Sequence, residues 1–397
     1  MRYQHAYIPY GAYWTSPFCR WQGSFAGLHP LRFAADVACR ALDERGIPTT
    51  AFDGLVLGTT VPSRHAFYGG SWLAGLLGAS EVTGPVVSQA CATSARVLAV
   101  AAGEVEAAGD RCVLAITADR TSNGPHLVWP DAASPGGRPE AEDWVWDNFG
   151  HDPYTGGSML QTAENVAEEA GISTMEQHEL VLLRYAQYQA ALADDRTFQR
   201  RYMVAPIEVP AGGRRTIEVV GDEGVYPSTP EGLARLKPVL PAGTVTFGGQ
   251  TYAADGNAGA LVTTAERAAE LGKDGVTVQL ASFAEGRAKP GYMPQAIVPA
   301  AERALADAGI AAGDLAAVNT HNPFAVNDIY LSRALGLDIT AMNRFGSSLI
   351  WGHPQAPTGL RSVIELVETL VTLGGGYGLF VGCSAGDSAA AVVVKVR

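Results

Sequence analysis

The sequence has few cysteines, few charged side chains and no long apolar run. Its five cysteines form no Cys-x-x-Cys pair and no zinc-ligand spacing, which argues against a disulfide framework and a zinc module. No apolar run approaches the ~20 residues that a membrane span requires. Residues 1–20 carry polar and charged side chains where a signal peptide would be apolar. Because an odd number of thiols suits a reducing compartment, we expect a cytoplasmic protein.

Positive charge is also scarce. The formal net charge of −12 argues against nucleic acid or an anionic membrane as a partner. Charged residues make up only 17% of the chain, a composition that favours a surface partly covered by other subunits. One local exception lies between Arg196 and Arg215, where five arginines accompany a single acid, Glu208. This stretch is either a site for a negatively charged ligand or a solvated loop surface.

Length and composition are those of a folded enzyme. The chain has 397 residues, of which 47% are hydrophobic, with 46 glycines and 23 prolines spread along it. Such a chain is too long for one small core, and its composition is not that of a disordered or fibrous protein. We expect two packed units or one large α/β body.

Strand and helix signals alternate in the N-terminal part. Residues 54–58 (GLVLG) and 85–89 (PVVSQ) are short runs typical of buried strands. Residues 95–108 are rich in alanine, with valine and leucine at helical spacing, and end at Gly109. Residues 112–118 form the next predicted strand. This order predicts parallel strands joined by a crossover helix.

The C-terminal part repeats this pattern without repeating the letters. Its predicted helices end at glycines, and its last two predicted strands are joined by a turn of small residues. Periodicity alone leaves open whether the two parts are an architectural duplication. The predicted elements are helices at 299–308 and 358–373 and strands at 315–319, 378–383 and 389–396.

Residues 121–245 differ from both ends. They begin with a stretch rich in proline, glycine and tryptophan, and they continue with a predicted helix pair at 161–170 and 175–194. An inserted segment of this kind is typical of a lid that contacts substrate. We therefore predict an N-terminal half at 1–120, an inserted lid domain at 121–245 and a C-terminal half at 246–397.

Cys91 lies where the strand at 85–89 gives way to the helix at 95–108. A thiol there is next to the unpaired N–H groups and the positive end of the helix, so we expect a lowered pKa and a favoured thiolate. A sharp strand-to-helix turn also exposes a nucleophile. The alternative is a small buried apolar residue, a common role for free cysteine.

Three more side chains that could take part in catalysis lie at the ends of predicted elements. Cys383 ends a strand and is followed by small residues whose N–H groups can converge on an oxyanion. His353 lies in a Gly-His-Pro turn, and His321 follows a predicted strand. The alternatives are a core thiol and two surface histidines. A thiolate, a base and oxyanion donors are together what acyl transfer from a thioester needs.

Four short segments follow one another along the chain: Cys91-Ala-Thr93, His321-Asn-Pro-Phe324, Gly352-His353-Pro354 and Cys383-Ser-Ala385. They resemble the four catalytic loops of the thiolase family, in the same order. Residues 161–173 (QTAENVAEEAGIS) and 222–238, with its Asp-Glu-Gly and Leu-Lys-Pro, are also similar to segments of that family. The resemblance covers most of the chain and indicates a divergent subgroup with an HNPF loop in place of NEAF.

The resemblance implies an α/β thiolase fold. Two similar βαβαβαββ halves would form a layered αβαβα sandwich with an inserted lid domain. The implied activity is CoA-dependent cleavage of a 3-oxoacyl-CoA, or Claisen condensation to it, through an acyl-Cys91 intermediate. Coenzyme A would be the co-substrate, and the resemblance implies no metal and no tightly bound cofactor.

By the same resemblance, Cys91 would carry the acyl group and His353 would accept its proton. Cys383 would act as acid and base at the α-carbon, and His321 would hydrogen-bond the thioester oxygen as it becomes an enolate. Such donors are essential because a carbanion next to a thioester is unstable. The backbone N–H groups of Cys91 and Ala385 would form a second oxyanion hole. The implied CoA-binding residues are Thr251, Arg214, Arg215 and Met159.

The sequence departs from the family in several places. The glycine of the CxG loop is an alanine, and Tyr252 stands where glycine is usual. An aromatic segment at 10–25 replaces the N-terminal RTPxG of the family. Together with Trp129, Trp144 and Trp146 of the predicted lid, these changes favour a bulky or aromatic acyl chain. The alternative is that the aromatic residues pack a dimer interface.

The resemblance also implies partners and leaves rival functions. It indicates acyl-CoA and CoA as ligands and a homodimer or dimer of dimers. Members with an HNPF loop resemble components of complexes with a small zinc-ribbon/OB-fold partner subunit. A Cys-His-His condensing synthase of the same superfamily is the main rival, favoured by His321 and disfavoured by Cys383. A catalytically inactive thiolase-like scaffold is the other.

Overall fold

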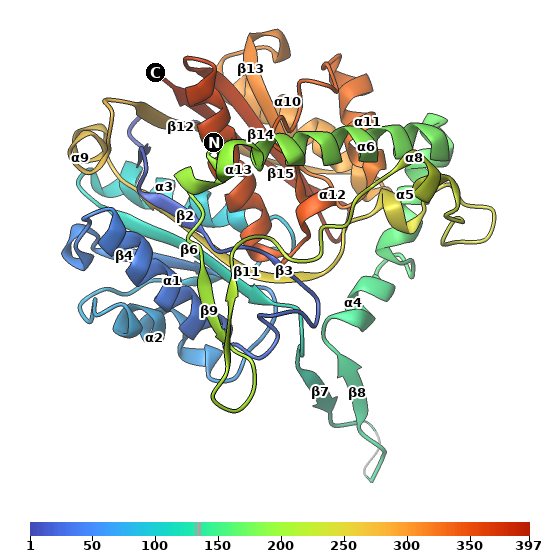
Figure 1. Cartoon of the computed structure of the whole chain (residues 1–397), viewed down its shortest axis with the longest axis horizontal. Helices are drawn as coiled ribbons and strands as arrows, with labels where there is room; N and C mark the ends of the chain where they lie inside the picture. The colour runs from blue at the N-terminus through green and yellow to red at the C-terminus, as the bar shows by residue number, and fades with distance from the viewer. Residues whose placement is uncertain (132, 134–135) are drawn as a thin grey trace.

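Two β-sheets organise the computed structural model, which describes residues 1–131, 133 and 136–397 (Figure 1). The first sheet has the order β2-β11-β6-β4-β5, and β3 also pairs with β11. β4 pairs in parallel with both β5 and β6, as the sequence predicted. Its strands are β2 (Tyr13–Thr15), β3 (Cys19–Arg20), β4 (Gly54–Gly58), β5 (Val86–Val87), β6 (Val113–Arg120) and β11 (Ala254–Val262).

The second sheet has the order β1-β12-β15-β14-β13. β13 and β14 are parallel, whereas β14 and β15 are antiparallel and joined by a short turn. In that turn Gly386 and Asp387 adopt positive φ angles of 78° and 53°. The strands are β1 (Tyr7–Pro9), β12 (Thr277–Arg287), β13 (Leu315–His321), β14 (Gly376–Ser384) and β15 (Ser388–Val396).

Helices lie in three layers around the two sheets. Two helices, α3 and α13, pack against each other between the sheets and contact strands of both. Helices α1 and α2 cover the outer face of the first sheet, α10 covers that of the second, and α11 packs beside α10. The order of layers is αβαβα, which confirms the predicted fold class. The bounds are α1 (Pro30–Glu44), α2 (Gly69–Leu76), α3 (Thr93–Ala108), α10 (Ile297–Ala308), α11 (Ala325–Leu335) and α13 (Ala356–Thr372).

The position of α13 between two sheets explains its composition. Every residue from Ala356 to Leu370 is buried, because the sheets and α3 enclose the helix on several sides. Polar residues on such a helix must find partners within the protein. The central layer therefore depends on buried polar contacts as well as on apolar packing.

The sheets exchange strands across the predicted boundaries. β11 comes after residue 246 and yet lies in the first sheet, between β2 and β6. β1 is the first strand of the chain and lies in the second sheet. A division of the chain into consecutive halves therefore does not separate the sheets.

Residues between β6 and β11 form two hairpins and several short helices. The predicted helix pair is present as α5 and α6, which both pack against α11. One hairpin, β7–β8, extends away from the body of the molecule (Figure 1). The elements are β7 (His126–Trp129), β8 (Glu140–Asp143), α4 (Trp146–Gly150), α5 (Met159–Ala170), α6 (Thr174–Ala191), α7 (Ala193–Arg196), β9 (Ile207–Pro210), β10 (Thr216–Val219) and α8 (Pro230–Ala234).

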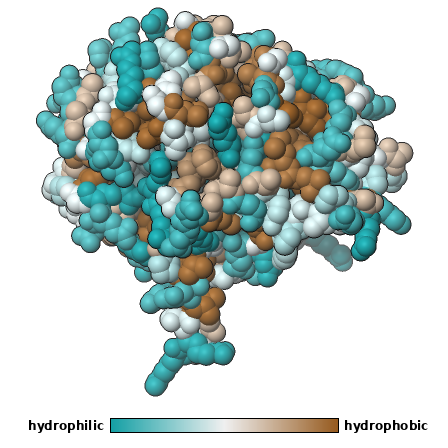
Figure 2. All heavy atoms as spheres, turned by 45° about the horizontal axis from the view of Figure 1, so that its top comes forward, coloured by the Kyte–Doolittle hydropathy of each residue, from teal (hydrophilic) through white to brown (hydrophobic). Residues whose placement is uncertain are grey.

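The remaining α-helices of the described residues are α9 (Ala265–Leu271) and α12 (Ser348–Trp351). Figure 2 shows that polar residues cover much of one face, with apolar residues gathered in patches between them. None of the helices in the described residues combines the length and apolar character needed to cross a membrane.

Candidate active site

Two pairs of elements bring four reactive side chains together. Cys91 comes two residues before α3, and His353 comes three residues before α13, so adjacent ends of two neighbouring helices present them. His321 is the last residue of β13, and Cys383 follows Gly382, the parallel partner of His321 on β14. Because parallel strands end at the same edge of a sheet, His321 and Cys383 reach one edge together.

The Cys91 thiol and the His353 imidazole are in hydrogen-bond contact. His353 Nε2 lies 3.1 Å from the Cys91 sulfur, and Nδ1 lies 2.6 Å from the hydroxyl of Thr358. In the tautomer whose Nδ1–H donates to Thr358, Nε2 has a free lone pair directed at the thiol. His353 can then accept the proton of Cys91 while the sulfur attacks a carbonyl carbon.

Burial opposes a charge on either member of this pair. It raises the pKa of the Cys91 thiol to about 12, while hydrogen bonds from the backbone N–H groups of Ala385 and Cys91 act against the rise. Burial also lowers the pKa of His353 to about 3. The predicted lowering of the thiol pKa was wrong, because desolvation outweighs the helix end. The pair rests as a neutral thiol and a neutral imidazole.

His321 joins this pair from the end of β13. It is buried, and its ring stacks on that of His353 with the ring centroids 4.1 Å apart. Its Nδ1 lies 2.8 Å from the hydroxyl of Ser348. Burial, with a smaller effect from His353, lowers the pKa of His321 well below its usual value, so the ring is neutral. Among the described residues its Nε2 has no hydrogen-bond partner, which leaves this nitrogen available to a substrate atom.

Cys91, His321 and His353 also offer three possible metal-ligand atoms within 4.8 Å of one another. A metal ion binds an imidazole nitrogen along its lone pair, in the plane of the ring. The two histidine rings are stacked with an angle of only 29° between their planes, so one ion would not lie in both planes. The arrangement suits proton transfer and hydrogen bonding better than metal binding.

Cys383 is fully buried near the other thiol. Burial raises the pKa of Cys383 well above its usual value, and a thiolate at Cys91 would raise it further. Nδ2 of Asn327 donates to its sulfur at 3.2 Å, which acts against the rise. A neutral thiol can give a proton to a carbanion, and Asn327 then stabilises the thiolate that remains. Asn327 was missed by the sequence analysis, although it follows the His321 loop closely.

The Cys91 and Cys383 loops are tied together by Ser384. Its hydroxyl donates to the carbonyl of Gln89 at 2.9 Å and accepts the N–H of Ala92 at 3.3 Å. This contact holds the N–H groups of Cys91 and Ala385 near the same sulfur. Two backbone N–H groups aimed at one point are suited to an oxyanion.

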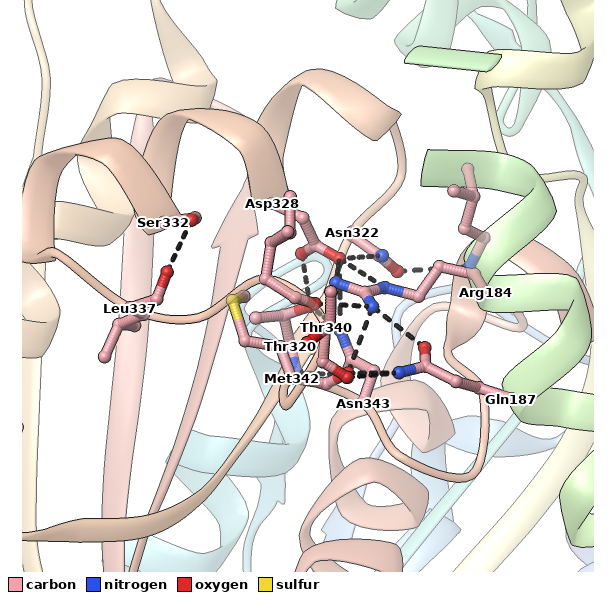
Figure 3. Close-up of polar contacts among 12 residues, drawn as sticks. Arg184, Gln187, Thr320, Asn322, Asp328, Ser332, Leu337, Thr340, Met342 and Asn343 are labelled. Atoms are coloured by element: carbon pink, nitrogen blue, oxygen red, sulfur yellow. Dashed lines mark hydrogen bonds and ion pairs between the residues drawn. The ribbon is translucent and has the colours of Figure 1, made fainter. Parts of the chain in front are cut away.

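A buried network holds the loop that begins at His321 (Figure 3). Asp328 accepts hydrogen bonds from the hydroxyl of Thr320 at 2.6 Å and from Nδ2 of Asn322 at 2.7 Å. Arg184 of α6 forms an ion pair with Asp328 at 2.8 Å, and both side chains are fully buried. Because Thr320 and Asn322 flank His321, the network fixes the backbone on both sides of the histidine. The sequence analysis missed it, since Arg184 lies far from Asp328 along the chain.

Asp119 connects the first sheet to the turn that carries His353. It is buried near the end of β6 and accepts the N–H and the hydroxyl of Thr60 at 2.8 and 2.7 Å. It also accepts the N–H of Ala356, at the start of α13, at 2.9 Å. Burial raises the pKa of Asp119 to about 6, and these hydrogen bonds act against the rise. No local pattern marks this residue, because its partners come from distant segments.

The four predicted CoA-binding residues lie in different places. Thr251 is close to the His321 loop, and its hydroxyl donates to the carbonyl of Ser348 at 2.5 Å. Met159 opens α5 and packs, half-buried, against the core on the outer side of the second sheet. Arg214 and Arg215 are exposed in the turn between β9 and β10.

The aromatic segment at 10–25 lies mainly inside the protein. Tyr13, Trp14, Phe18 and Phe25 are each at most 1% exposed, so they do not form a dimer surface. The hydroxyl of Tyr13 donates to a buried glutamate, and Phe18 packs against Trp351. The suggestion that this segment as a whole lines a pocket or an interface is therefore corrected, since these four residues build the core.

Two models of one protein family match most of the chain. The family models described as "Thiolase, N-terminal domain" and "Thiolase, C-terminal domain" match residues 12–266 and 275–396. Acetyl-CoA acetyltransferase of Escherichia coli (strain K12) is 29% identical over 389 residues, which cover 94% of this chain and 95% of that protein. Peroxisomal 3-ketoacyl-CoA thiolase A of Mus musculus is 36% identical over 245 residues, covering 59% of this chain and 56% of that protein.

The fold has counterparts among solved structures. Human mitochondrial 3-ketoacyl-CoA thiolase matches with a TM-score of 0.89 and 24% identity, covering 99% of both chains. The acetyl-CoA acetyltransferase of Bacillus anthracis matches with a TM-score of 0.88 at 24% identity and covers 100% of both chains. At these identities the matches establish the fold.

Proposed function

The chain belongs to the thiolase family, and from this premise we propose that it is a CoA-dependent acyltransferase acting on 3-oxoacyl-CoA. It cleaves this substrate with CoA or forms it by Claisen condensation. The observation that carries the proposal is the 3.1 Å contact between the Cys91 sulfur and Nε2 of His353, with His321 and Cys383 beside it.

In the first half-reaction Cys91 becomes acylated. Its sulfur forms a bond to the thioester carbonyl carbon while His353 Nε2 accepts the thiol proton. The carbonyl oxygen gains negative charge and binds the N–H groups of Cys91 and Ala385. As the intermediate collapses, the bond to the leaving group breaks. For acetyl-CoA the leaving group is the CoA thiolate, and it takes the proton from His353.

The second half-reaction forms or breaks the carbon–carbon bond. In condensation, Cys383 first gives its proton to His353, and the resulting thiolate removes a proton from the α-carbon of a second acetyl-CoA, whose thioester oxygen becomes an enolate oxygen and binds His321. The α-carbon then attacks acyl-Cys91, and the Cys91 sulfur leaves and takes the proton from His353.

In cleavage, the Cys91 sulfur bonds to the 3-oxo carbon while His353 accepts its proton, the bond from that carbon to the α-carbon breaks, and Cys383 protonates the α-carbon. His353 then returns its proton to Cys383, and CoA takes the acyl group from Cys91 while the CoA thiol proton passes through His353 to the Cys91 sulfur. Burial raises the pKa of the Cys383 thiol, so this thiol gives its proton most readily to a strong base such as the carbanion.

The CoA moiety is proposed to contact Thr251, Met159, Arg214 and Arg215. Thr251 is attached by its hydroxyl to the same segment that holds His321, which suits a contact to the part of CoA nearest the thioester. Three neighbouring arginines already have partners: Arg196 at the Val220 carbonyl, Arg200 at Asp195 and Arg201 at Glu368. The exposed Arg214 and Arg215 are therefore the residues of that stretch proposed for the CoA phosphates.

The acyl chain is proposed to be bulky or aromatic. Trp144 lies close to the site, since its indole N–H donates to the carbonyl of Thr60, a residue that also holds Asp119. Trp146 is 48% exposed and packs edge-on against Trp21. Trp129 lies on the β7–β8 arm. Faster cleavage of benzoylacetyl-CoA than of acetoacetyl-CoA is expected, and the opposite preference would contradict the proposal.

Oligomerisation is proposed through the free edge of the first sheet. Among the strands of the described residues, β5 pairs only with β4. Val86 on β5 is 46% exposed, and the neighbouring Phe67 and Tyr68 are 91% and 69% exposed. A homodimer or dimer of dimers would cover these side chains. A small zinc-ribbon/OB-fold partner subunit, a cytoplasmic location and the division at residues 120 and 245 also remain proposals from the sequence.

Mass spectrometry after incubation with acetyl-CoA tests the central proposal. An acetyl group on Cys91 is expected in the native chain and in Cys383→Ala, but not in Cys91→Ala. Cys383→Ala is expected to lose carbon–carbon cleavage by at least about 100-fold, because its acid–base group is gone. Full cleavage by Cys383→Ala would favour the Cys-His-His synthase. No adduct on the native chain from acetyl-CoA or longer acyl-CoA donors would favour the inactive scaffold.

A further inference from the structure

The hydroxyl of Ser348 lies between His321 and the next residue in the chain. Its oxygen is 2.8 Å from Nδ1 of His321 and 3.1 Å from Oδ1 of Asn322. It also accepts the backbone N–H of Asn322 at 3.1 Å. The hydroxyl of Thr251 donates to the carbonyl of Ser348, which fixes the backbone of this residue. Ser348 is fully buried, so these contacts are shielded from water.

The single proton of the Ser348 hydroxyl controls which nitrogen of His321 carries hydrogen. The neutral ring has one N–H, on either Nδ1 or Nε2. If the hydroxyl donates to Nδ1, the ring proton is on Nε2, and the ring presents a donor to the substrate. If the hydroxyl donates to Asn322 instead, Nδ1–H must donate to Ser348, and Nε2 presents a lone pair. Only the first arrangement can hydrogen-bond an enolate oxygen.

Two contacts favour the first arrangement. Oδ1 of Asn322 already accepts the backbone N–H of Leu349 at 3.2 Å, so it does not need the serine proton. The 3.1 Å contact to Oδ1 is also longer than the about 2.7–2.8 Å usual for a hydroxyl that donates to an oxygen, whereas the 2.8 Å contact to Nδ1 has an ordinary hydrogen-bond length. An sp² ring nitrogen without a hydrogen is a good acceptor for a hydroxyl.

We propose that Ser348 is a positioning residue that fixes His321 in the Nε2–H tautomer, so that its free nitrogen donates to the thioester oxygen during the carbon–carbon step. The inference rests on the proposed function for the identity of that oxygen. It gives a role to the one nitrogen of His321 that lacks a partner in the described part of the chain. It also explains why a serine hydroxyl is buried beside a neutral histidine.

Ser348→Ala tests this role, with Ser347→Ala as its matched control. Ser347 is a buried neighbour whose hydroxyl has no hydrogen-bond partner among the described residues. Ser348→Ala is expected to slow cleavage of acetoacetyl-CoA about 10- to 100-fold, somewhat less than complete loss of an oxyanion donor. Acetylation of Cys91 by acetyl-CoA is expected to continue, because that step uses His353 and backbone N–H groups. Ser347→Ala is expected to change neither step.

The His321→Asn background separates a tautomer effect from a structural one. An asparagine amide always has N–H donors, so its function does not depend on a ring proton. Adding Ser348→Ala to His321→Asn is expected to change cleavage less than about threefold. An equal loss in both backgrounds would overturn the proposal, since it would show that Ser348 only supports the fold.

Nitrogen NMR of protein labelled with ¹⁵N-histidine reads the tautomer directly. The His321 signals are assigned from their absence in His321→Asn. A protonated Nε2 and an unprotonated Nδ1 are expected in the native chain, and the reverse would overturn the proposal even where Ser348→Ala does not fold. This result does not depend on catalysis. A native chain with the expected tautomer but no acyl-Cys91 would therefore contradict the proposed function separately.

Discussion

At the scale of single residues, the site combines reactive groups that are kept neutral. A thiolate and an imidazolium would attract each other at 3.1 Å, but burial disfavours both charges. A bound thioester offsets the cost of forming these charges, because its carbonyl carbon bonds to the sulfur and its oxygen binds the backbone N–H groups. Cys91 is therefore activated by its substrate rather than in advance.

This view predicts the pH dependence of Cys91 alkylation. Because its pKa is raised to about 12, the thiol is protonated at neutral pH, and only the rare thiolate reacts with iodoacetamide. The rate is expected to rise about tenfold per pH unit between about pH 6 and pH 9, without a plateau. The measurement is the alkylated fraction of the Cys91 peptide against time.

The exposed Cys39 provides a reference within the same chain. Its peptide reports on the reagent and on the stability of the fold across the pH range, so Cys91 rates are compared with it. A Cys91 rate that is constant from pH 6 upward would contradict the neutral pair. It would indicate a preformed thiolate–imidazolium pair instead.

At the scale of elements, a buried arginine anchors the central helix α13. Arg361 forms ion pairs with Asp222 at 2.6 Å and with Glu365 at 2.9 Å. Its guanidinium also lies over the rings of Phe18 and Trp351, at 4.9 and 4.3 Å from their centroids. The contacts join α13 to the segment before α8 and to the N-terminal strands. They hold the helix whose first turn follows His353.

Replacing Arg361 should therefore destabilise the protein strongly. Arg361→Met leaves two buried carboxylates without their partner and is expected to lower the free energy of unfolding by about 3–5 kcal/mol. Arg200→Met removes the exposed ion pair with Asp195, whose side chains are 65% and 78% exposed, and should cost at most about 1 kcal/mol. Urea unfolding curves of both variants make the comparison. Equal effects would contradict the role of Arg361.

Local signals made many elements predictable. α3 and α10 end at Gly109 and Gly309, both in the left-handed region, and the sequence marked both ends. β4 has the predicted bounds because its apolar run is buried on both faces. These features depend on residues close together in the chain, so a single sequence reveals them.

Long-range features were not predictable in the same way. β1 pairs with β12, about 270 residues later in the chain, and no local pattern encodes that pairing. The prediction of a lowered pKa for Cys91 was wrong for the same reason. The helix end is a local feature, whereas the desolvation that raises the pKa comes from distant segments. Ser348 and Asp328 likewise act only through tertiary contacts, and the loop motifs did not include them.

At the scale of the whole molecule, the site exists because two helices of the central layer begin side by side. Cys91 precedes α3, His353 precedes α13, and these helices lie side by side between the sheets. Their first turns are joined directly by a hydrogen bond from the hydroxyl of Ser94 to the carbonyl of Ala356. The distance between thiol and imidazole is thus set by how closely the two helices pack. We therefore expect catalysis to depend on how α3 packs against α13 as well as on the reactive residues themselves.

Gly359 is where this dependence can be tested. A methyl group at this position of α13 would lie 2.9 Å from Cβ of Ser94 on α3 and 3.1 Å from the ring of Phe380, so Gly359→Ala should push the helices apart. The expected loss in the rate of Cys91 acetylation is about 10- to 100-fold, because small displacements of reacting groups have large effects. The free energy of unfolding should fall by only about 1–3 kcal/mol.

Gly103→Ala is the matched control. This glycine also lies on a central helix, and a methyl group there meets nothing within 4 Å. It should stabilise α3 by about 0.4–1 kcal/mol and leave acetylation unchanged. Acetylation rates by mass spectrometry and urea unfolding of the same samples separate the two effects, and a Gly359→Ala protein that is less stable but acetylates at the native rate would show that helix spacing does not set the chemistry.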